Sequence, residues 1–322
     1  MIWIGGLVTT SGAGMAVPDW PNTYGYNLFA YPLATWIYGP WKLFIEHGHR
    51  LFGTLVGMIT IGFLISTWVC QRKSALRWLG AAALAGVLLQ GVLGGMRVLA
   101  GEVLIAQIHG CVGPAFFAFT IALAAITSER WRDAQPIDSP GIAKIERLAL
   151  IITFLAFLQI VLGSQLRHLP TWARPGEFRA ALHFHLIVAA ALWAHIVMLA
   201  IRARRTCLYE GWIMRPITGL SIAIVVQIFL GLATWVTKYG FPAWLSSFDF
   251  AAAFRPTADA PWQMSIATAH VAIGSMILGT SLLIALRSRR LVARDDTALK
   301  SPTHTAPLRR GNGSTLLMEA VR

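Results

Sequence analysis

The chain has 322 residues, of which 56% are hydrophobic and 13% charged, and its mean hydropathy is +0.61. Soluble domains carry roughly 25% charged residues, and the one or two soluble cores of a chain this long could not bury so much apolar side chain. The composition therefore argues against a soluble protein and predicts an all-α integral membrane protein. The net charge of +13 would suggest nucleic acid in a soluble protein, but in a membrane protein it marks cytoplasmic loops, and we expect no nucleic-acid partner.

The first predicted element is the apolar segment MIWIGGLVTT, residues 1–10, which has about half the roughly 20 residues that span a bilayer. We expect it to be the outward end of a shortened first helix; a re-entrant or surface segment is the alternative. Seven longer apolar stretches follow, at roughly 43–70, 78–100, 104–127, 147–166, 179–201, 216–236 and 263–286. The chain is thus predicted to have eight transmembrane helices.

Basic residues orient these helices. With the N-terminal segment pointing outward, 19 Lys and Arg residues fall in the inner loops and the tail against 7 in the outer loops. Because Lys and Arg are enriched in cytoplasmic loops, we expect the C-terminus on the cytoplasmic or matrix side. The membrane would be a bacterial cell membrane or a mitochondrial inner membrane. The polar segment 291–322 is predicted to be a disordered tail on that side.

One short pattern recurs three times. It is a Gln followed four residues later by a Gly, in LQGVLGGMR (89–97), LQIVLGSQLR (158–167) and VQIFLGLAT (226–234). Residues four apart share one face of a helix. For the glycines alone, ordinary packing of small residues between membrane helices is the favoured interpretation.

Histidine-containing segments repeat as well. EHGHRLFGTLVG (46–57) parallels LHFHLIVAAALW (182–193), and IHGCVGPAF (108–116) parallels AHVAIGSMI (269–277). The chain is therefore predicted to consist of two pseudo-symmetric four-helix bundles, residues 1–135 and 146–290, followed by the tail 291–322.

Four histidines stand at matching positions of the two halves: His49, His109, His185 and His270. Each lies five to seven residues into an outward-to-inward span, which predicts one depth of roughly 8–10 Å. Ionisable residues inside a membrane are usually functional, and two imidazoles facing each other across a bundle suit the axial positions of haem iron. Packing histidines held by hydrogen bonds are the alternative.

Two further histidines, His47 and His183, lie two residues before a candidate ligand and point away from it on the helix. Donation to haem propionates is one interpretation. We favour the other, in which both face the lipid headgroups.

The two halves differ beside the first histidine of each. Glu46 lies one turn before it in the first half and Arg50 follows it, whereas the second half has Leu182 and Leu186. A carboxylate there can relay protons or fix the ring, and an arginine can pair with a propionate. The alternative is that Glu46 and Arg50 pair with each other or with Arg97.

Several of these motifs resemble the heme A synthase family of cytochrome oxidase assembly enzymes. They are GGLVTTSGAGMAVPDWPNTYG (5–25), EHGHRLFGTLVG, LQGVLGGMR and IHGCVG, and the resemblance covers about 1–290. It implies a membrane oxidoreductase that converts the ring methyl of heme O to the formyl of heme A. It further implies that His49 and His109 hold the substrate haem, that His185 and His270 hold a haem b cofactor, and that Glu46 is the catalytic carboxylate.

The chain departs from the family pattern at three places. Thr9 stands where many members carry an arginine, Leu186 follows the third histidine where arginine is usual, and segment 18–42 lacks the two cysteines of some bacterial members. The missing arginine bears most directly on activity.

Two other functions compete with the enzyme. One is a transmembrane diheme b electron-transfer cytochrome, and the other is a non-catalytic haem-binding assembly factor. For the enzyme, the expected partners are heme O as substrate, heme O synthase, an electron-transfer partner and the lipid bilayer.

Overall fold

The computed structural model describes residues 1–292 except 138, 171 and 209, and over that part of the chain every regular element is a helix. Seven of these helices are long and apolar enough to cross a membrane, which confirms the seven predicted spans. They are α3 (Trp41–Cys70), α4 (Ser74–Ala100), α5 (Val103–Thr127), α7 (Pro140–Arg167), α8 (Pro175–Thr206), α9 (Gly211–Tyr239) and α11 (Pro261–Leu291). The expected tail, apart from residues 291 and 292, lies outside the described residues.

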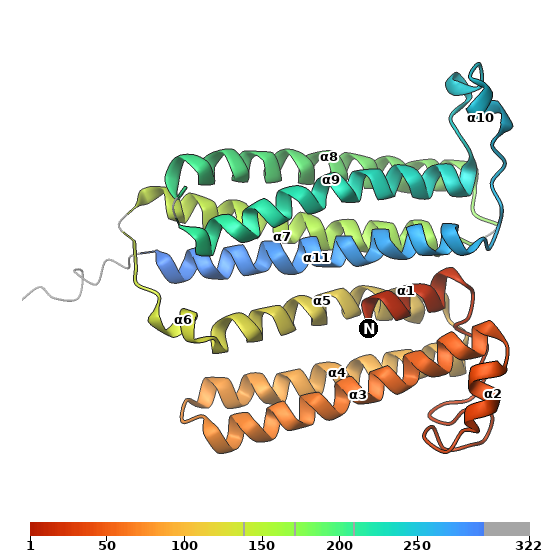
Figure 1. Ribbon diagram of the computed structural model, residues 1–322, viewed down its shortest axis with the longest axis horizontal. Coiled ribbons are helices and arrows are strands. Elements are labelled where there is room, and N and C mark those ends of the chain that lie inside the picture. Colours follow the sequence, from red (N-terminus) through yellow and green to blue (C-terminus); the bar gives the residue numbers. More distant parts are fainter. Residues whose placement is uncertain (138, 171, 209, 293–322) are drawn as a thin grey trace, which may run out of the picture.

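The short N-terminal segment forms helix α1 (Ile2–Thr10) among the long helices, and its first residue lies about midway along them (Figure 1). It packs against α3 and α11. Gly6 allows the closest approach, because a methyl group placed there would lie 2.9 Å from Cγ2 of Thr268 in α11. A hydrogen bond of 2.9 Å also joins the hydroxyls of Thr10 and Thr268. Small and hydroxyl side chains thus bring α1 close to α11, as is common between membrane helices.

The long helices alternate in direction, so their connections gather at two ends (Figure 1). One end carries α2 (Leu33–Tyr38), the 3₁₀ turn η1 (Ala243–Leu245) and α10 (Asp249–Ala253); we call it the α2/α10 end. The opposite end carries α6 (Glu129–Asp133) and short turns. Helices α3, α5, α8 and α11 begin at the α2/α10 end, and each contains one of the four candidate histidines.

The largest buried cluster lies between α7, α8, α9 and α11. Its fully buried side chains include Ile145, Ile152, Leu199, Ile217 and Ile284. In contrast, α3 and α4 expose many large apolar side chains, for example Ile59 and Leu88. A soluble protein could not leave such a surface in water, and it is the surface expected of helices in contact with lipid.

The helices extend beyond the spans predicted from hydropathy. Helix α8 begins at Pro175 and continues through Arg202, Arg204 and Arg205 to Thr206. The reason is that hydropathy detects only the apolar stretch that would lie in hydrocarbon. Proline at the first helical position starts the helix before that stretch, and backbone hydrogen bonding continues the helix beyond its other end. The candidate histidines therefore lie six to ten residues into their helices, roughly 9–15 Å from the helix start. The predicted five to seven residues were therefore too few, whereas a common depth below the outer membrane surface stays a prediction.

Candidate functional site

Each of the four candidate histidines packs against a glycine of a neighbouring helix. A methyl group placed on any of these glycines would lie 3.1–3.4 Å from Cε1 of the ring it faces, which is tighter than most Cβ contacts. Each ring therefore lies in a cradle formed by bare glycine backbone, where a side chain would make the ring shift by a few tenths of an ångström. The pairs are His49 with Gly5 of α1, His109 with Gly94 of α4, His185 with Gly163 of α7, and His270 with Gly231 of α9.

The repeated glutamines hold the same histidine-bearing helices. Nε2 of Gln90 donates to the carbonyl of His109 at 3.3 Å, and Nε2 of Gln159 donates to that of His185 at 3.0 Å. Nε2 of Gln227 lies 3.5 Å from Nε2 of His270. The recurring Gln-x-x-x-Gly pattern thus supplies both a clamp for the histidine helix and the cradle for its ring.

All four rings keep a buried nitrogen that nothing in the described chain satisfies. The unpartnered atoms are Nδ1 of His49, His109, His185 and His270. A buried polar atom without a hydrogen-bond partner is costly, and most such atoms in folded proteins are paired. An unpartnered nitrogen at all four repeat-related rings is unexpected for packing histidines, which exist to complete hydrogen bonds, and fits rings that serve a bound group.

The spacing of the second-half pair agrees with axial ligation of haem. The ring centroids of His185 and His270 lie 6.5 Å apart. With metal–nitrogen distances of about 2.0–2.1 Å, two imidazoles on opposite sides of one metal ion place their centroids roughly 6.4 Å apart. Across the residues that the structure describes, no three His, Cys, Asp or Glu side chains come together as a metal-binding group. The second half therefore offers a metal ion two imidazoles, the donor set of a six-coordinate haem, and the first half carries His49 and His109 at the repeat-related positions.

Glu46 and Arg50 form an ion pair of 3.0 Å, and both side chains are almost entirely buried. Oε2 of Glu46 also accepts a hydrogen bond from the backbone N–H of Val17 at 3.0 Å. The terminal nitrogens of Arg50 donate to the carbonyls of Val17, Asp19 and Asn22. The pair thus fastens the loop 17–22. Of the two interpretations of Glu46 and Arg50, this arrangement favours pairing with each other, because Arg50 is not free to bind a propionate.

The loop 17–22 covers the first half at the α2/α10 end. The indole of Trp20 lies against Gly95 of α4, beside the glycine that faces His109. Asp19 closes the loop by accepting hydrogen bonds from the backbone N–H groups of Tyr24 and Gly25, both at 2.8 Å. Burial raises the pKa of Asp19, but these two hydrogen bonds, together with its own backbone N–H and the charge of Arg50, hold the pKa below its ordinary value.

His47 does not face lipid headgroups, so that prediction was wrong. The ring is 2% exposed, and its Nδ1 lies 3.0 Å from the hydroxyl of Thr23. Its faces pack on Tyr31 and Trp36, at centroid distances of 5.0 and 5.2 Å. The first connecting loop folds over this ring, which a pattern of helix positions could not reveal. His183 is exposed on α8, as the favoured interpretation requires.

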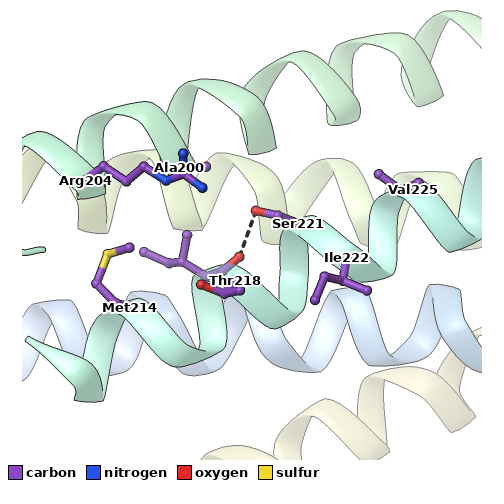
Figure 2. Close-up of a pocket in the computed structure, with 8 residues that line it drawn as sticks. Ala200, Arg204, Met214, Thr218, Ser221, Ile222 and Val225 are labelled. Carbon is purple, nitrogen blue, oxygen red and sulfur yellow. Dashed lines mark hydrogen bonds between the residues drawn. The ribbon is translucent and has the colours of Figure 1, made fainter.

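A groove of about 320 Å³ lies between α8 and α9, and Figure 2 shows its lining. It begins at Ala200, 15 residues beyond His185, or roughly 22 Å along the helix. None of the candidate histidines contributes to it. Its lining consists of Ala200, Arg204, Met214, Ile217, Thr218, Ser221, Ile222 and Val225. The groove is therefore separate from the histidine sites.

Sequence reasoning missed the role of the glycines in the repeated pattern. It attributed them to ordinary helix packing, whereas Gly94, Gly163 and Gly231 each face a candidate ligand. The available clue was that each glycine recurred together with a glutamine, a residue that packing alone does not require.

A family model described as "Cytochrome oxidase assembly protein" matches residues 1–172, which is more than half of the chain. Three relatives, each named heme A synthase, are similar to it. The protein of Shouchella clausii is 26% identical over 172 residues (51% of this chain, 53% of the relative). That of Beijerinckia indica is 34% identical over 131 residues (38% of this chain, 35% of the relative). That of Rhizorhabdus wittichii is 24% identical over 290 residues (74% of this chain, 82% of the relative).

The chain thus spans about half or less of the first two relatives and most of the third. No solved structure matches the chain. The matched segment 1–172 contains α1, the loop 17–22, Glu46 and both first-half histidines with their glycine cradles. The chain belongs to the cytochrome oxidase assembly protein family.

Proposed function

We propose that this chain is a membrane oxidoreductase that converts the ring methyl of heme O to the formyl of heme A for cytochrome oxidase assembly. The observation that carries the proposal is the pair of glycine-cradled imidazoles in the first half beside a buried Glu46–Arg50 pair. The heme A synthase relatives support the choice of substrate. In this proposal His49 and His109 bind the substrate haem, and His185 and His270 bind haem b.

We also propose that the eight helices form two pseudo-symmetric four-helix halves, 1–135 and 146–290. In this arrangement α1, α3, α4 and α5 correspond to α7, α8, α9 and α11. The repetition of one His–Gly pair on each of four helix pairs supports it. The orientation follows the basic residues, with the tail 291–322 on the cytoplasmic or matrix side of a bacterial cell membrane or mitochondrial inner membrane.

The chain's own residues would bind, orient and accept protons. Turning a methyl into a formyl group removes four electrons and four protons when water supplies the oxygen, so the site needs a proton acceptor and an electron acceptor. Each carboxylate oxygen of Glu46 accepts one hydrogen bond in the structure and keeps a second lone pair for a proton. The loop 17–22 limits water access from the α2/α10 end. Haem b, when bound, would supply one-electron transfer toward a partner outside the chain.

The test is co-expression with heme O synthase in a host that makes no heme A, followed by haem extraction and chromatography. The intact chain is expected to yield heme A. Glu46→Gln keeps the size of the side chain and a hydrogen-bond acceptor but removes the proton-accepting carboxylate, so heme A should fall by roughly 10²-fold or more while bound heme O persists. Asp19→Asn is the matched control, since it perturbs the same loop and leaves Glu46 in place.

Undiminished heme A with Glu46→Gln would refute the role of Glu46. A loss of similar size with Asp19→Asn would assign the effect to the loop instead. No heme A from intact protein that holds heme O would refute the enzyme.

A diheme b electron-transfer cytochrome is the second candidate. It is favoured by the similarity of the imidazole cradles in both halves and by the engagement of Glu46 with Arg50 and Val17. If the chain is a diheme cytochrome or a non-catalytic haem-binding assembly factor, purified protein would hold haem b in both halves. In the co-expression test, heme O would then remain unchanged.

A further inference from the structure

Two arginines lie beside the candidate histidine sites without an acidic partner. Arg97 is in the last turn of α4 and Arg167 is in the last turn of α7, and both are half-buried inside membrane-spanning helices. Among the described residues, neither forms an ion pair; the two ion pairs there are Arg50–Glu46 and Arg132–Glu129. A guanidinium at membrane depth that lacks a direct ion pair is costly, and such residues usually pair with an anion or serve a ligand.

Each arginine is one helical turn from a histidine cradle. Arg97 follows Gly94, which faces His109, by three residues, and Arg167 follows Gly163, which faces His185, by four residues. Residues three or four apart lie on one face of a helix. Both helices run toward the α2/α10 end (Figure 1), so each arginine follows its cradle glycine in the direction of that end.

The contacts of the two side chains show that both are held in place. A methyl group placed on Gly14 would overlap the guanidinium of Arg97, so that group lies directly against the backbone after α1. Nη2 of Arg167 donates to the carbonyl of Gly6 in α1 at 3.1 Å. Both charges act on His168, which follows α7, so an anion near them would be favoured.

The titration of His168 reflects the same positive region. This residue follows α7 directly, and its Nδ1 lies 2.9 Å from the carbonyl of Ser164. Burial is the main cause that lowers its pKa, and Arg167 and Arg97 lower it further, against the hydrogen bond to Ser164, which raises it. The field at this end of the helices therefore favours negative charge.

The two halves carry the arginine that follows a cradle glycine on different helices. At the position of Arg167, four residues after the cradle glycine, the first half has Thr9. At the position of Arg97, three residues after the cradle glycine, the second half has Thr234. Both threonine hydroxyls bond to their own helix, at Gly5 and Leu230. Each half therefore has one arginine beside a cradle glycine, on α4 in the first half and on α7 in the second.

We propose that Arg97 and Arg167 are carboxylate-binding residues, Arg97 for the propionates of the porphyrin held in the first half and Arg167 for those of the porphyrin in the second half. The inference rests on the haem sites of the proposed function. It replaces the expectation that Arg50 binds a propionate, because the two terminal nitrogens of Arg50 make four hydrogen bonds to the loop 17–22 and Glu46, whereas Arg167 makes one among the described residues, to Gly6. Arginine suits this role because its planar donors bind a carboxylate in a bidentate manner.

The test compares two porphyrins that differ only in their carboxylates. Full-length protein produced without haem is titrated with ferric protoporphyrin IX and with its dimethyl ester, and binding is followed by Soret absorbance. A His185→Ala/His270→Ala background isolates the first half, and a His49→Ala/His109→Ala background isolates the second. In each background we expect the ester to bind at least about 10-fold more weakly than the free acid, the lower end for a hydrogen bond to a charged group.

Arg97→Gln in the first-half background should reduce the affinity for the free acid about 10-fold and leave the affinity for the ester unchanged. The ratio of free-acid affinity to ester affinity should therefore fall close to one. Arg167→Gln should do the same in the second-half background. Arg179→Gln, an exposed arginine of α8, is the control and should leave the ratio unchanged. The ratio separates ligand binding from a structural role, because a distorted site weakens both porphyrins equally.

An unchanged ratio in Arg97→Gln or Arg167→Gln would overturn the assignment for that half. It would also be the result if the arginine served a phospholipid headgroup. Equal losses for both porphyrins would likewise overturn it in favour of a structural role. If neither porphyrin binds the intact chain, the haem sites of the proposed function fail; if both bind and the ratios do not respond, only this inference fails.

Discussion

Replacing Gly231 by alanine tests the cradle geometry directly. The new methyl group would lie 3.1 Å from Cε1 of His270, closer than ordinary contact, so the ring must shift by a few tenths of an ångström. Overpacking a close contact costs about 1–3 kcal/mol, while alanine gains about 0.8–1.0 kcal/mol over glycine inside a helix. We therefore expect haem affinity in the second half to fall roughly 5- to 30-fold, equivalent to about 1–2 kcal/mol, with little net change in protein stability.

The matched control is Gly219→Ala on the same helix. A methyl group at Gly219 meets nothing within 4 Å, so this variant should gain the helix propensity of alanine without touching the site. Both variants are purified in the His49→Ala/His109→Ala background, which leaves only the second-half site. Haem content and the free-acid titration of that site are then measured, together with the midpoint of thermal unfolding.

Equal haem affinity in Gly231→Ala and Gly219→Ala would refute the reasoning, because the contact with His270 would then have no bearing on ligation. A large loss of stability in Gly231→Ala without loss of haem would also contradict it, since the cost would have fallen on helix packing rather than on the ring.

Three further predictions concern the loop 17–22 and the glutamine clamp. Arg50→Gln removes four hydrogen bonds from the loop and Glu46, and we expect proteolysis within the loop to accelerate at least about 10-fold, measured in nanodiscs against the intact chain. The pKa of Asp19 lies below its ordinary value of 3.8, so its contribution to loop stability is present above that pH and is lost as the pH falls through the folded pKa; Asp19→Asn should abolish this acid-dependent increase in proteolysis. Gln159→Leu removes the 3.0 Å bond to the carbonyl of His185 and should weaken haem binding in the second half by about 1 kcal/mol, roughly fivefold, whereas an unchanged affinity would show that the clamp is dispensable.

The spans, and the equivalent positions of the four candidate histidines, could be predicted because their causes are periodic. Hydropathy reports directly on burial in lipid, and His49 and His185 stand in segments that repeat along the chain. The contacts of the loop 17–22 could not be predicted in this way. The partners of Arg50 are carbonyls brought close only when the loop folds back over α3, and backbone carbonyls leave no mark in a sequence. The burial of His47 escaped prediction for the same reason, since Tyr31 and Trp36 cover it from another segment.

Within the proposed function, the asymmetry of the two halves supports our assignment of the substrate haem to the first half. Their imidazole cradles are alike, so ligation alone would give two equivalent haem positions. Over the first half, however, lies a loop fastened through Glu46 and Arg50, with Trp20 against α4. At the corresponding positions the second half has Leu182 and Leu186, neither of which can form an ion pair, and Leu186 is exposed. Hydrogen bonds and an ion pair can break and re-form during a catalytic cycle at modest cost, which suits a site that must admit heme O and release heme A. A half that lacks both the carboxylate and the fastened loop has no comparable means of handling protons, and this is the environment expected of a resident electron-transfer haem.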